Sequence, residues 1–216
     1  MQRASLFIDG NALFQAIDEL NEASLKWLDP ARLASQLAAD HVQIRRLVFA
    51  FTVTGEDRAR AQQERTYLRA LSALGVACLT EDPVREFHEC GRCGHGWDDR
   101  RARHNEANLA LEILHDAWSD SFDEAWLVTD QIGESHLARK LARFQHKSLT
   151  LLSLRSIPRM MHDTATLKRK TLTKRQLRAA TLSETVRTAQ GEMIARPRGW
   201  APRESATWRD LEITGL

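Results

Sequence analysis

The chain has 216 residues, of which 43% are apolar and 28% are charged, and its formal net charge is +2. This length suits one globular domain, alone or with a tail, that can bury a core without disulfides or metals. No run approaches the ~20 apolar residues of a membrane span, and three cysteines with one CxxC pair argue against a disulfide framework. Because the N-terminal apolar run is also too short for a secretory signal, we expect a cytoplasmic protein.

Short apolar runs alternate with amphipathic segments along the chain. The run 5–8 predicts a first strand, and the helical spacing that follows predicts helices over 12–20 and 31–39. A strand at 47–53, a long helix over 56–74 that ends at Gly75 and a strand at 76–79 come next. Beyond a segment rich in Gly, His and Cys, we expect a helix over 101–118, a strand at 124–129, a helix over 133–144 and a strand at 148–154.

This alternation predicts βαβ units, and hence an α/β fold in three layers with a mainly parallel sheet of about five strands flanked by helices. The pattern weakens after Arg155, where we expect at most an edge strand at 165–167 and a short basic helix over 173–180. We therefore divide the chain into a domain of residues 1–155, with an insert at 82–99, and a C-terminal extension of residues 156–216. The extension is expected to pack on the domain or to trail from it.

Acidic side chains follow two of the predicted strands. Asp9 ends the first strand and Asp130 follows the fourth, while Glu106 lies early in the helix that precedes the fourth strand. In a parallel sheet these positions share the rim where ligands bind. Clustered carboxylates suit Mg²⁺ or Mn²⁺, which can activate a water for phosphodiester cleavage, and Asn11 could position a phosphate or a water. The alternative is that Asp9 is only a turn or N-cap residue.

The order of several motifs resembles bacterial NYN-domain proteins, which are related to PIN-domain ribonucleases. The segments that carry the resemblance are FIDGNALFQAI at 7–17, QERTYLRAL at 63–71, CGRCGHGW at 90–97, ANLALEILHDA at 107–117, AWLVTD at 125–130, KRQLRAATL at 174–182 and ARPRGW at 195–200. The resemblance implies a PIN-like, Rossmannoid fold and a Mg²⁺- or Mn²⁺-dependent endoribonuclease. Its site carboxylates would be Asp9, Glu106 and Asp130, supported by Asn11 and Thr129.

Two departures from the family pattern bear on activity. The family usually has Lys-x-x-Asp where this chain has Arg103-His104-Asn105-Glu106. The family's fourth-strand motif also has a second acid at the position that is Ile132 in this chain. Three carboxylates are enough for one Mg²⁺ and make a second metal doubtful. A second function therefore stays open, namely a weakened or inactive NYN-fold protein that acts as a nucleic-acid-binding or adaptor module.

The insert contains a CxxC pair flanked by histidines. Zinc takes four N or S ligands in a tetrahedron, and the ligands expected here are Cys90, Cys93, His88 and His95. Four ligands within eight residues would be unusually compact, so one or both histidines could be replaced by ligands from elsewhere, for which His104 and Cys78 are candidates. A redox CxxC pair and a site without metal are the alternatives, although the Gly-rich setting and the nearby histidines favour structural zinc.

The C-terminal segment is strongly basic. Residues 155–203 hold twelve Lys or Arg against three Asp or Glu, which leaves the rest of the chain acidic. The densest positive cluster comprises Lys168, Arg169, Lys170, Lys174 and Arg175. Such side chains contact nucleic-acid phosphates without reading sequence, so we expect a nucleic acid, RNA in the first place, as partner. A solvated helix face is the alternative, and a homodimer is left open.

Three tryptophans fall in expected loops or in the tail, namely Trp97, Trp200 and Trp208. If exposed, their rings could stack on unpaired bases. Aromatic side chains at such positions more often pack and fix a loop.

Overall fold

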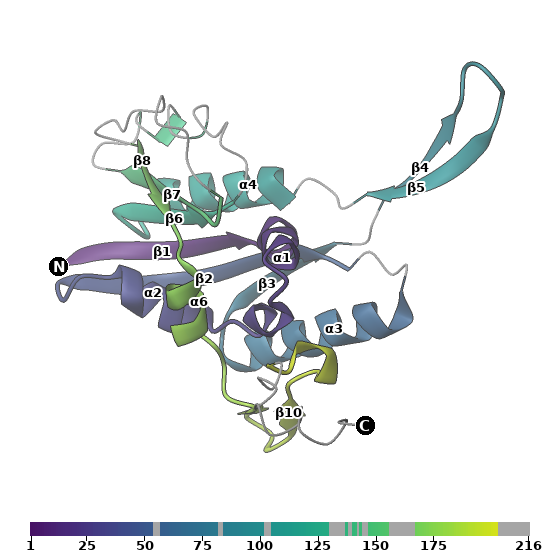
Figure 1. The fold of residues 1–216 in the computed structure, drawn as a ribbon. Coiled ribbons are helices and arrows are strands. Elements are labelled where there is room, and N and C mark those ends of the chain that lie inside the picture. Colours follow the sequence, from purple (N-terminus) through teal and green to yellow (C-terminus); the bar gives the residue numbers. More distant parts are fainter. Residues whose placement is uncertain are drawn as a thin grey trace, which may run out of the picture.

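The computed structural model describes residues 1–53, 57–81, 84–101, 105–129, 137, 140–141, 143, 147–155 and 167–202, with the backbone alone at 84–86, 98–101 and 106. Its centre is a six-stranded sheet in the order β3-β2-β1-β6-β7-β8, in which every pair of neighbours is parallel (Figure 1). The strands are β1 (Gln2–Asp9), β2 (Val42–Thr52), β3 (Ala77–Glu81), β6 (Glu124–Val128), β7 (Ser148–Ser153) and β8 (Leu167–Thr171).

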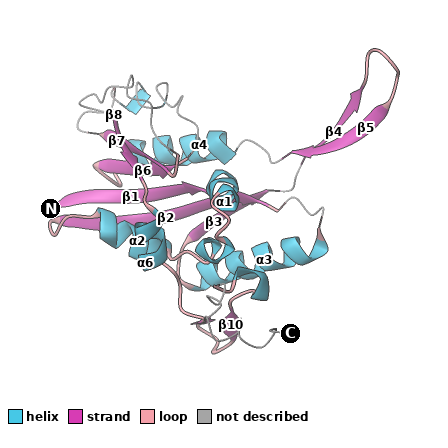
Figure 2. Ribbon diagram, viewed as in Figure 1, coloured by secondary structure: helices cyan, strands magenta, loops and turns pink. Residues whose placement is uncertain are grey.

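Helices cover both faces of this sheet, as Figure 2 shows. The helices are α1 (Gly10–Glu19), α2 (Pro30–Leu37), α3 (Arg58–Ala73), α4 (Asn105–Trp118) and α6 (Lys174–Ala179), with short 3-10 turns at Ala23–Lys26 and Arg198–Trp200. Alternate residues of β1 enter two cores: Leu6 and Ile8 pack with α1, α2 and α3, whereas Phe7 packs with α4. A strand that is buried on both faces consists of consecutive apolar residues, and such runs are what the sequence prediction of these strands used.

The predicted α/β class is confirmed, with six strands where about five were expected. The predicted helix over 133–144 lies largely outside the described residues. Gly75 follows α3 with a φ of +80°, the left-handed conformation expected of a glycine after a helix. Within the part of the chain that the structure describes, no helix combines the length and apolar character needed to cross a bilayer.

The C-terminal segment packs on the domain and completes it. The expected boundary at residue 155 falls between β7 and β8 of one sheet, because Leu149↔Leu167 to Ser153↔Thr171 pair in parallel. Beyond β8, the segment forms α6 and a small hairpin of β9 (Thr185–Arg187) and β10 (Met193–Ala195). It adds apolar side chains to the core over α1 to α3, namely Leu172, Leu177, Ala180, Leu182, Val186, Ile194 and Trp200.

An ion-pair cluster links the start of β1 to the turn before β6. Asp120 accepts from Lys147 (2.5 Å) and from Arg3 (3.1 Å), and these two cations, Lys147 first, lower the pKa of Asp120 to about 2 from its ordinary 3.8. Asp120 has a φ of 52°, a conformation that Asn also tolerates. The substitution Asp120→Asn therefore removes the charge without adding backbone strain.

We expect Asp120→Asn to lower the melting temperature at pH 7. A carboxyl whose pKa is depressed by folding stabilises the protein above its unfolded pKa, and that contribution disappears as pH falls through the folded pKa. The difference in melting temperature between the wild type and the variant should thus shrink between about pH 4 and pH 2. Thermal unfolding followed by circular dichroism across this range measures it. A difference that stays constant down to pH 2 would exclude the ion pairs as its source.

Candidate functional site

The strand order places a topological switch point between β1 and β6. From β1 the chain moves outward in one direction to β2 and β3, and then returns to β6 on the other side of β1. In open α/β sheets, ligands bind outside the carboxyl ends of the strands at such a point. Ile8 pairs with Val128, so Asp9 and Thr129 are the next residues on two strands that lie ~4.8 Å apart. The rim at Asp9 and Thr129 is therefore the candidate site.

Asp9 occupies the last position of β1 and also caps α1. Its Oδ1 accepts the backbone N–H groups of Asn11 (3.1 Å) and Ala12 (3.2 Å), and only 5% of the residue is exposed. A negative charge is favourable at a helix N-terminus because the backbone dipoles point their positive ends there. Asp9 thus has the capping role that the sequence left open, and this role holds the carboxylate at the rim.

Gly10 follows Asp9 for a steric reason. A Cβ at this position would lie 2.4 Å from Cζ of Phe49, far inside van der Waals contact. The absence of a side chain lets the first turn of α1 lie directly on the phenyl rings of β2. The Asp-Gly pair consequently sets how closely α1, and with it the Asp9 cap, approaches the sheet.

The side chain of Asn11 ties three elements together at the same rim. Its Nδ2 donates to the carbonyl oxygen of Thr52 (3.0 Å), and its Oδ1 accepts the Thr52 backbone N–H (2.8 Å). The same Oδ1 accepts from Nδ2 of Asn105 (2.6 Å), and the Thr52 hydroxyl donates to Oδ1 of Asn105 (3.2 Å). The ends of β1 and β2 and the start of α4 are thereby fixed against each other. Asn11 thus has a structural role at the rim, while the supporting role expected from the sequence stays a prediction.

Asn11→Ala should destabilise the fold by about 1–3 kcal/mol, because it removes both hydrogen bonds between the Asn11 side chain and the Thr52 backbone. The backbone N–H and carbonyl oxygen of Thr52 then lose these partners. Urea denaturation followed by fluorescence would measure the loss. Gln15→Ala, an exposed change on the same helix, is the control and should stay within about 0.5 kcal/mol of the wild type. Equal stability of Asn11→Ala and the wild type would show that the network contributes nothing.

The other two predicted carboxylates are only partly covered by the structure. Position 106 lies in the first turn of α4, directly after Asn105, so its backbone is at the rim, while its side chain is outside the described part. Asp130 also lies outside the described residues. Thr129, which precedes it, is buried and donates its N–H to the carbonyl oxygen of Leu152 (3.0 Å). The structure therefore brings together Asp9, Asn11, Thr129 and the backbone of position 106.

Sequence reasoning missed further polar side chains at the same rim. Thr52 and Ser153 end β2 and β7, and both are buried. Each is a short hydroxyl residue directly after an apolar run, which is the pattern that could have identified them. Beside Asn11, an open groove of about 600 Å³ runs along α1 and α3, lined by Asn11, Phe14, Gln15, Asp18, Glu19, Phe51 and Arg60.

The predicted basic cluster divides into two parts. On α6, Lys174 and Arg178 both pair with Glu22 (3.1 and 2.8 Å), and these cations, Arg178 first, lower the pKa of the Glu22 carboxyl. On the edge strand β8, Lys168 and Lys170 are exposed, and Arg169 is half-buried. Lysines also protect sheet edges from pairing with other chains, so their presence on β8 has a structural explanation as well. Arg175 is exposed on α6.

The insert forms an antiparallel hairpin of β4 (Val84–Glu89) and β5 (Gly96–Arg101), two strands that the sequence did not predict. The two predicted histidine ligands lie at its end, where the rings of His88 and His95 stack against Trp97 at centroid distances of 5.6 and 6.3 Å. Cys90 and Cys93 lie in the turn, and hydrogen bonds from the backbone of Arg92 lower the pKa of the Cys90 thiol, as do those from Cys93.

The alternative zinc ligands lie elsewhere. Cys78 is on β3, and its thiol is directed at the carbonyl oxygens of Leu68 and Val76 (both 3.7 Å). Burial raises the pKa of that thiol, as expected for a structural cysteine. His104 lies outside the described residues.

Two of the three tryptophans noted in the sequence are described. Trp200 is buried, so the packing interpretation holds for it. Trp97 is 46% exposed on the hairpin, and Trp208 lies outside the described residues.

Comparisons with known proteins concern the fold alone. No family model matches the chain, and no curated protein matches it. A crystal structure of a Vibrio parahaemolyticus protein of unknown function is similar, with a TM-score of 0.51 and 13% sequence identity. The match covers 80% of this chain and 94% of that chain. The structural similarity supports a shared α/β architecture, and a sequence identity this low says nothing about a shared activity.

Proposed function

We propose that this chain is a metal-dependent endonuclease that hydrolyses phosphodiester bonds, with RNA as its substrate. The observation that carries the proposal is the buried Asp9 at the switch point between β1 and β6. Thr129 lies beside Asp9 and is followed by Asp130, and the first turn of α4, which contains Glu106, is tied to Asn11. The backbone of position 106 and Thr129, the residue before Asp130, thus lie at the same rim as Asp9.

The donors at this rim suit a hard divalent cation. Carboxylate oxygens are the ligands that Mg²⁺ and Mn²⁺ prefer, and Asp9, Glu106 and Asp130 would hold the ion. Such an ion lowers the pKa of a bound water and stabilises the leaving oxygen when it is present. The protein's own part is to fix the carboxylates: the α1 backbone orients Asp9, and Asn11 and Asn105 hold the start of α4 beside it.

The basic side chains support a polyanionic substrate. Lys168 and Lys170 are exposed on β8 and Arg175 on α6, whereas Lys174 is paired with Glu22. Contacts from such cations to phosphates weaken steeply with salt, so binding of RNA should fall as ionic strength rises. Replacement of Lys168 and Lys170 should weaken binding of all sequences to a similar extent.

The test is cleavage of single-stranded RNA and single-stranded DNA of matched sequence with Mg²⁺, with Mn²⁺ and with a chelator. We expect RNA cleavage that needs one of the two ions. Faster cleavage of DNA would refute the substrate class but keep the reaction. Salt-sensitive binding with no cleavage in either metal would instead support the alternative of a nucleic-acid-binding or adaptor module, which the Ile132 position already suggests.

A further inference from the structure

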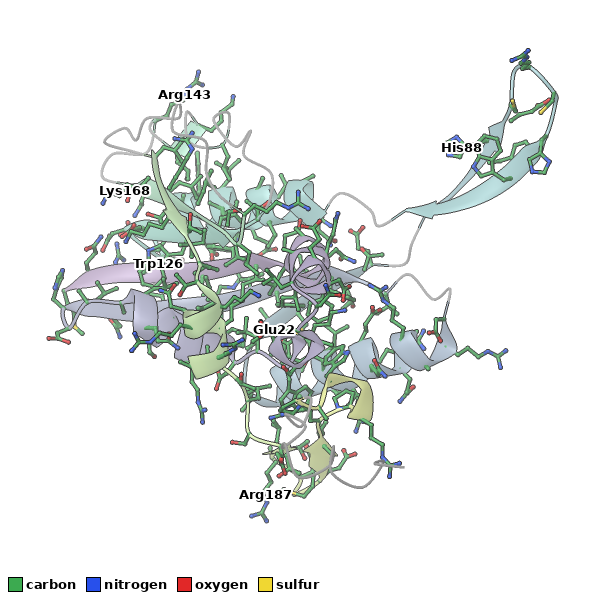
Figure 3. All side chains as sticks on the ribbon, viewed as in Figure 1. Glu22, His88, Trp126, Arg143, Lys168 and Arg187 are labelled. Atoms are coloured by element: carbon green, nitrogen blue, oxygen red, sulfur yellow. The ribbon has the colours of Figure 1, made fainter. Side chains whose placement is uncertain are left out.

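The β4–β5 hairpin projects from the rim end of the sheet, away from the other elements (Figures 1 and 3). Within the described residues, its strands pair only with each other, from Val84↔Arg101 to Glu89↔Gly96. A lone two-stranded hairpin is at best marginally stable in water. This one also exposes two large aromatic side chains, Phe87 (69%) and Trp97 (46%). A projecting hairpin with exposed rings indicates that something else holds or covers its end.

The turn at its tip brings two thiols together. The N–H of Cys90 donates to the carbonyl oxygen of His95 (2.8 Å), and the N–H of Gly94 donates to the carbonyl oxygen of Cys90 (2.8 Å). Gly94 adopts a φ of +69°, which closes the turn at little cost for a glycine. Cys90 and Cys93 therefore lie three residues apart in one tight turn, which is the spacing of a zinc-binding CxxC pair. Two cysteines held in one turn can supply two ligands to the same metal ion.

This pair provides half of a zinc coordination sphere. Structural zinc takes four ligands, commonly four thiolates. In the ranges that the structure describes, no three His, Cys, Asp or Glu side chains gather closely enough to hold a metal ion. The rings of His88 and His95 stack on Trp97, and Cys78 contacts carbonyl oxygens of the domain core. The Cys90–Cys93 pair alone thus leaves two positions of such a sphere to be filled.

We propose that the Cys90–Cys93 turn is one half of a zinc site that a second copy of this chain completes, so that one ion joins two hairpins tip to tip. A two-fold axis through the metal would give each copy the same role and supply two thiolates from each, which makes a closed set of four. The tip can reach a second copy because it projects from its own domain (Figure 3). Pairing of the two hairpins would also cover part of the exposed aromatic surface. The proposal does not depend on the nuclease assignment.

The test uses the full chain, purified without a histidine tag, reduced and stripped of metal. Zn²⁺ is then added while molar mass is followed by light scattering after size exclusion, and bound zinc is measured on the same fractions. We expect the mass to double from 24.6 kDa, with one zinc bound per two chains and reversal by a chelator. Co²⁺ in place of zinc should give the charge-transfer absorption of four thiolate ligands.

Variants separate this arrangement from the alternatives. Cys90→Ser and Cys93→Ser should stay monomeric in zinc, whereas Cys78→Ser should dimerise like the wild type. His88→Gln and His95→Gln should keep both the dimer and its zinc. A monomer that binds one zinc per chain and loses it in a histidine variant would overturn the proposal in favour of a site within one chain. A mass that zinc does not change, or a Cys90–Cys93 disulfide in place of metal uptake, would also overturn it.

Discussion

Asp9→Asn is expected to lower the rate of metal-dependent RNA cleavage at least ~100-fold, the loss of ~2.7 kcal/mol of transition-state stabilisation. The change removes one negative charge from the rim and leaves the shape of the side chain almost unaltered. Its Oδ1 can still accept from the N–H groups of Asn11 and Ala12, because Asn caps a helix about as well as Asp. Far-UV circular dichroism and the melting temperature should therefore match those of the wild type, while the cleavage rate measured with a labelled RNA falls.

Asp29→Asn is the matched control. Asp29 caps α2 in the same way, with its Oδ1 accepting from Ala31 (2.9 Å) and Arg32 (3.1 Å). The two substitutions are thus the same chemical change at equivalent helix positions, and only one of them alters the proposed metal site. Cleavage by Asp29→Asn should equal that of the wild type. Equal rates in all three proteins would reject Asp9 as a catalytic residue, and an equal loss in both variants would assign the effect to capping.

The central sheet was predictable because a strand that is buried on both faces has a continuous run of apolar residues. Residues 47–53 and 148–154 are such runs, and both became strands of the six-stranded sheet. β2 begins earlier than expected, at Val42, because its first residues alternate between exposed and half-buried positions and include charges. The hairpin strands VREFHE and GWDDRR are rich in charge, so nothing in their composition marked them as strands.

The candidate site was predictable only as a set of positions. Strand ends identified Asp9, and the parallel order of β1 and β6 explains why it lies beside Thr129. The role of Asn11 could not be foreseen, because its partners Thr52 and Asn105 are 41 and 94 residues away along the chain. The identity of an Asn residue does not indicate which distant group it will hydrogen-bond, whereas the spacing of apolar residues indicates which face of an element is buried.

The C-terminal segment was predictable only in part, because an edge strand and a short basic helix were expected near β8 and α6 but nothing was expected beyond them. The buried side chains beyond α6, among them Leu182 and Trp200, are spaced too irregularly to suggest a helix or a strand. They are held by contacts with distant elements: the Leu182 N–H donates to the carbonyl oxygen of Trp27 (2.9 Å), and the Trp27 indole N–H donates to that of Ser183 (2.7 Å). The composition of the segment left open whether it packs on the domain or trails from it, and its buried apolar side chains make it part of the core.

Trp200→Ala tests how much this segment stabilises the domain, and we expect it to lower the free energy of unfolding by about 3–5 kcal/mol. The indole is 4% exposed and packs against the rings of Phe14, Trp27 and Tyr67, at centroid distances of 5.3, 6.5 and 5.7 Å. Its removal leaves a cavity among rings that belong to α1, α3 and the loop before α2, which cannot all move to fill it. Denaturation in urea, followed by circular dichroism, measures the change.

Trp118→Ala is the control, since it deletes the same side chain at a position that is 82% exposed near the end of α4, and should change the unfolding free energy by less than about 0.5 kcal/mol. A small effect of both variants would mean that the C-terminal segment docks on a domain that is stable without it. A large effect confined to Trp200→Ala would mean that the segment stabilises α1 through Phe14. Because the N-terminus of α1 is capped by Asp9, loss of this packing should then also weaken RNA cleavage at temperatures where the variant is still mostly folded.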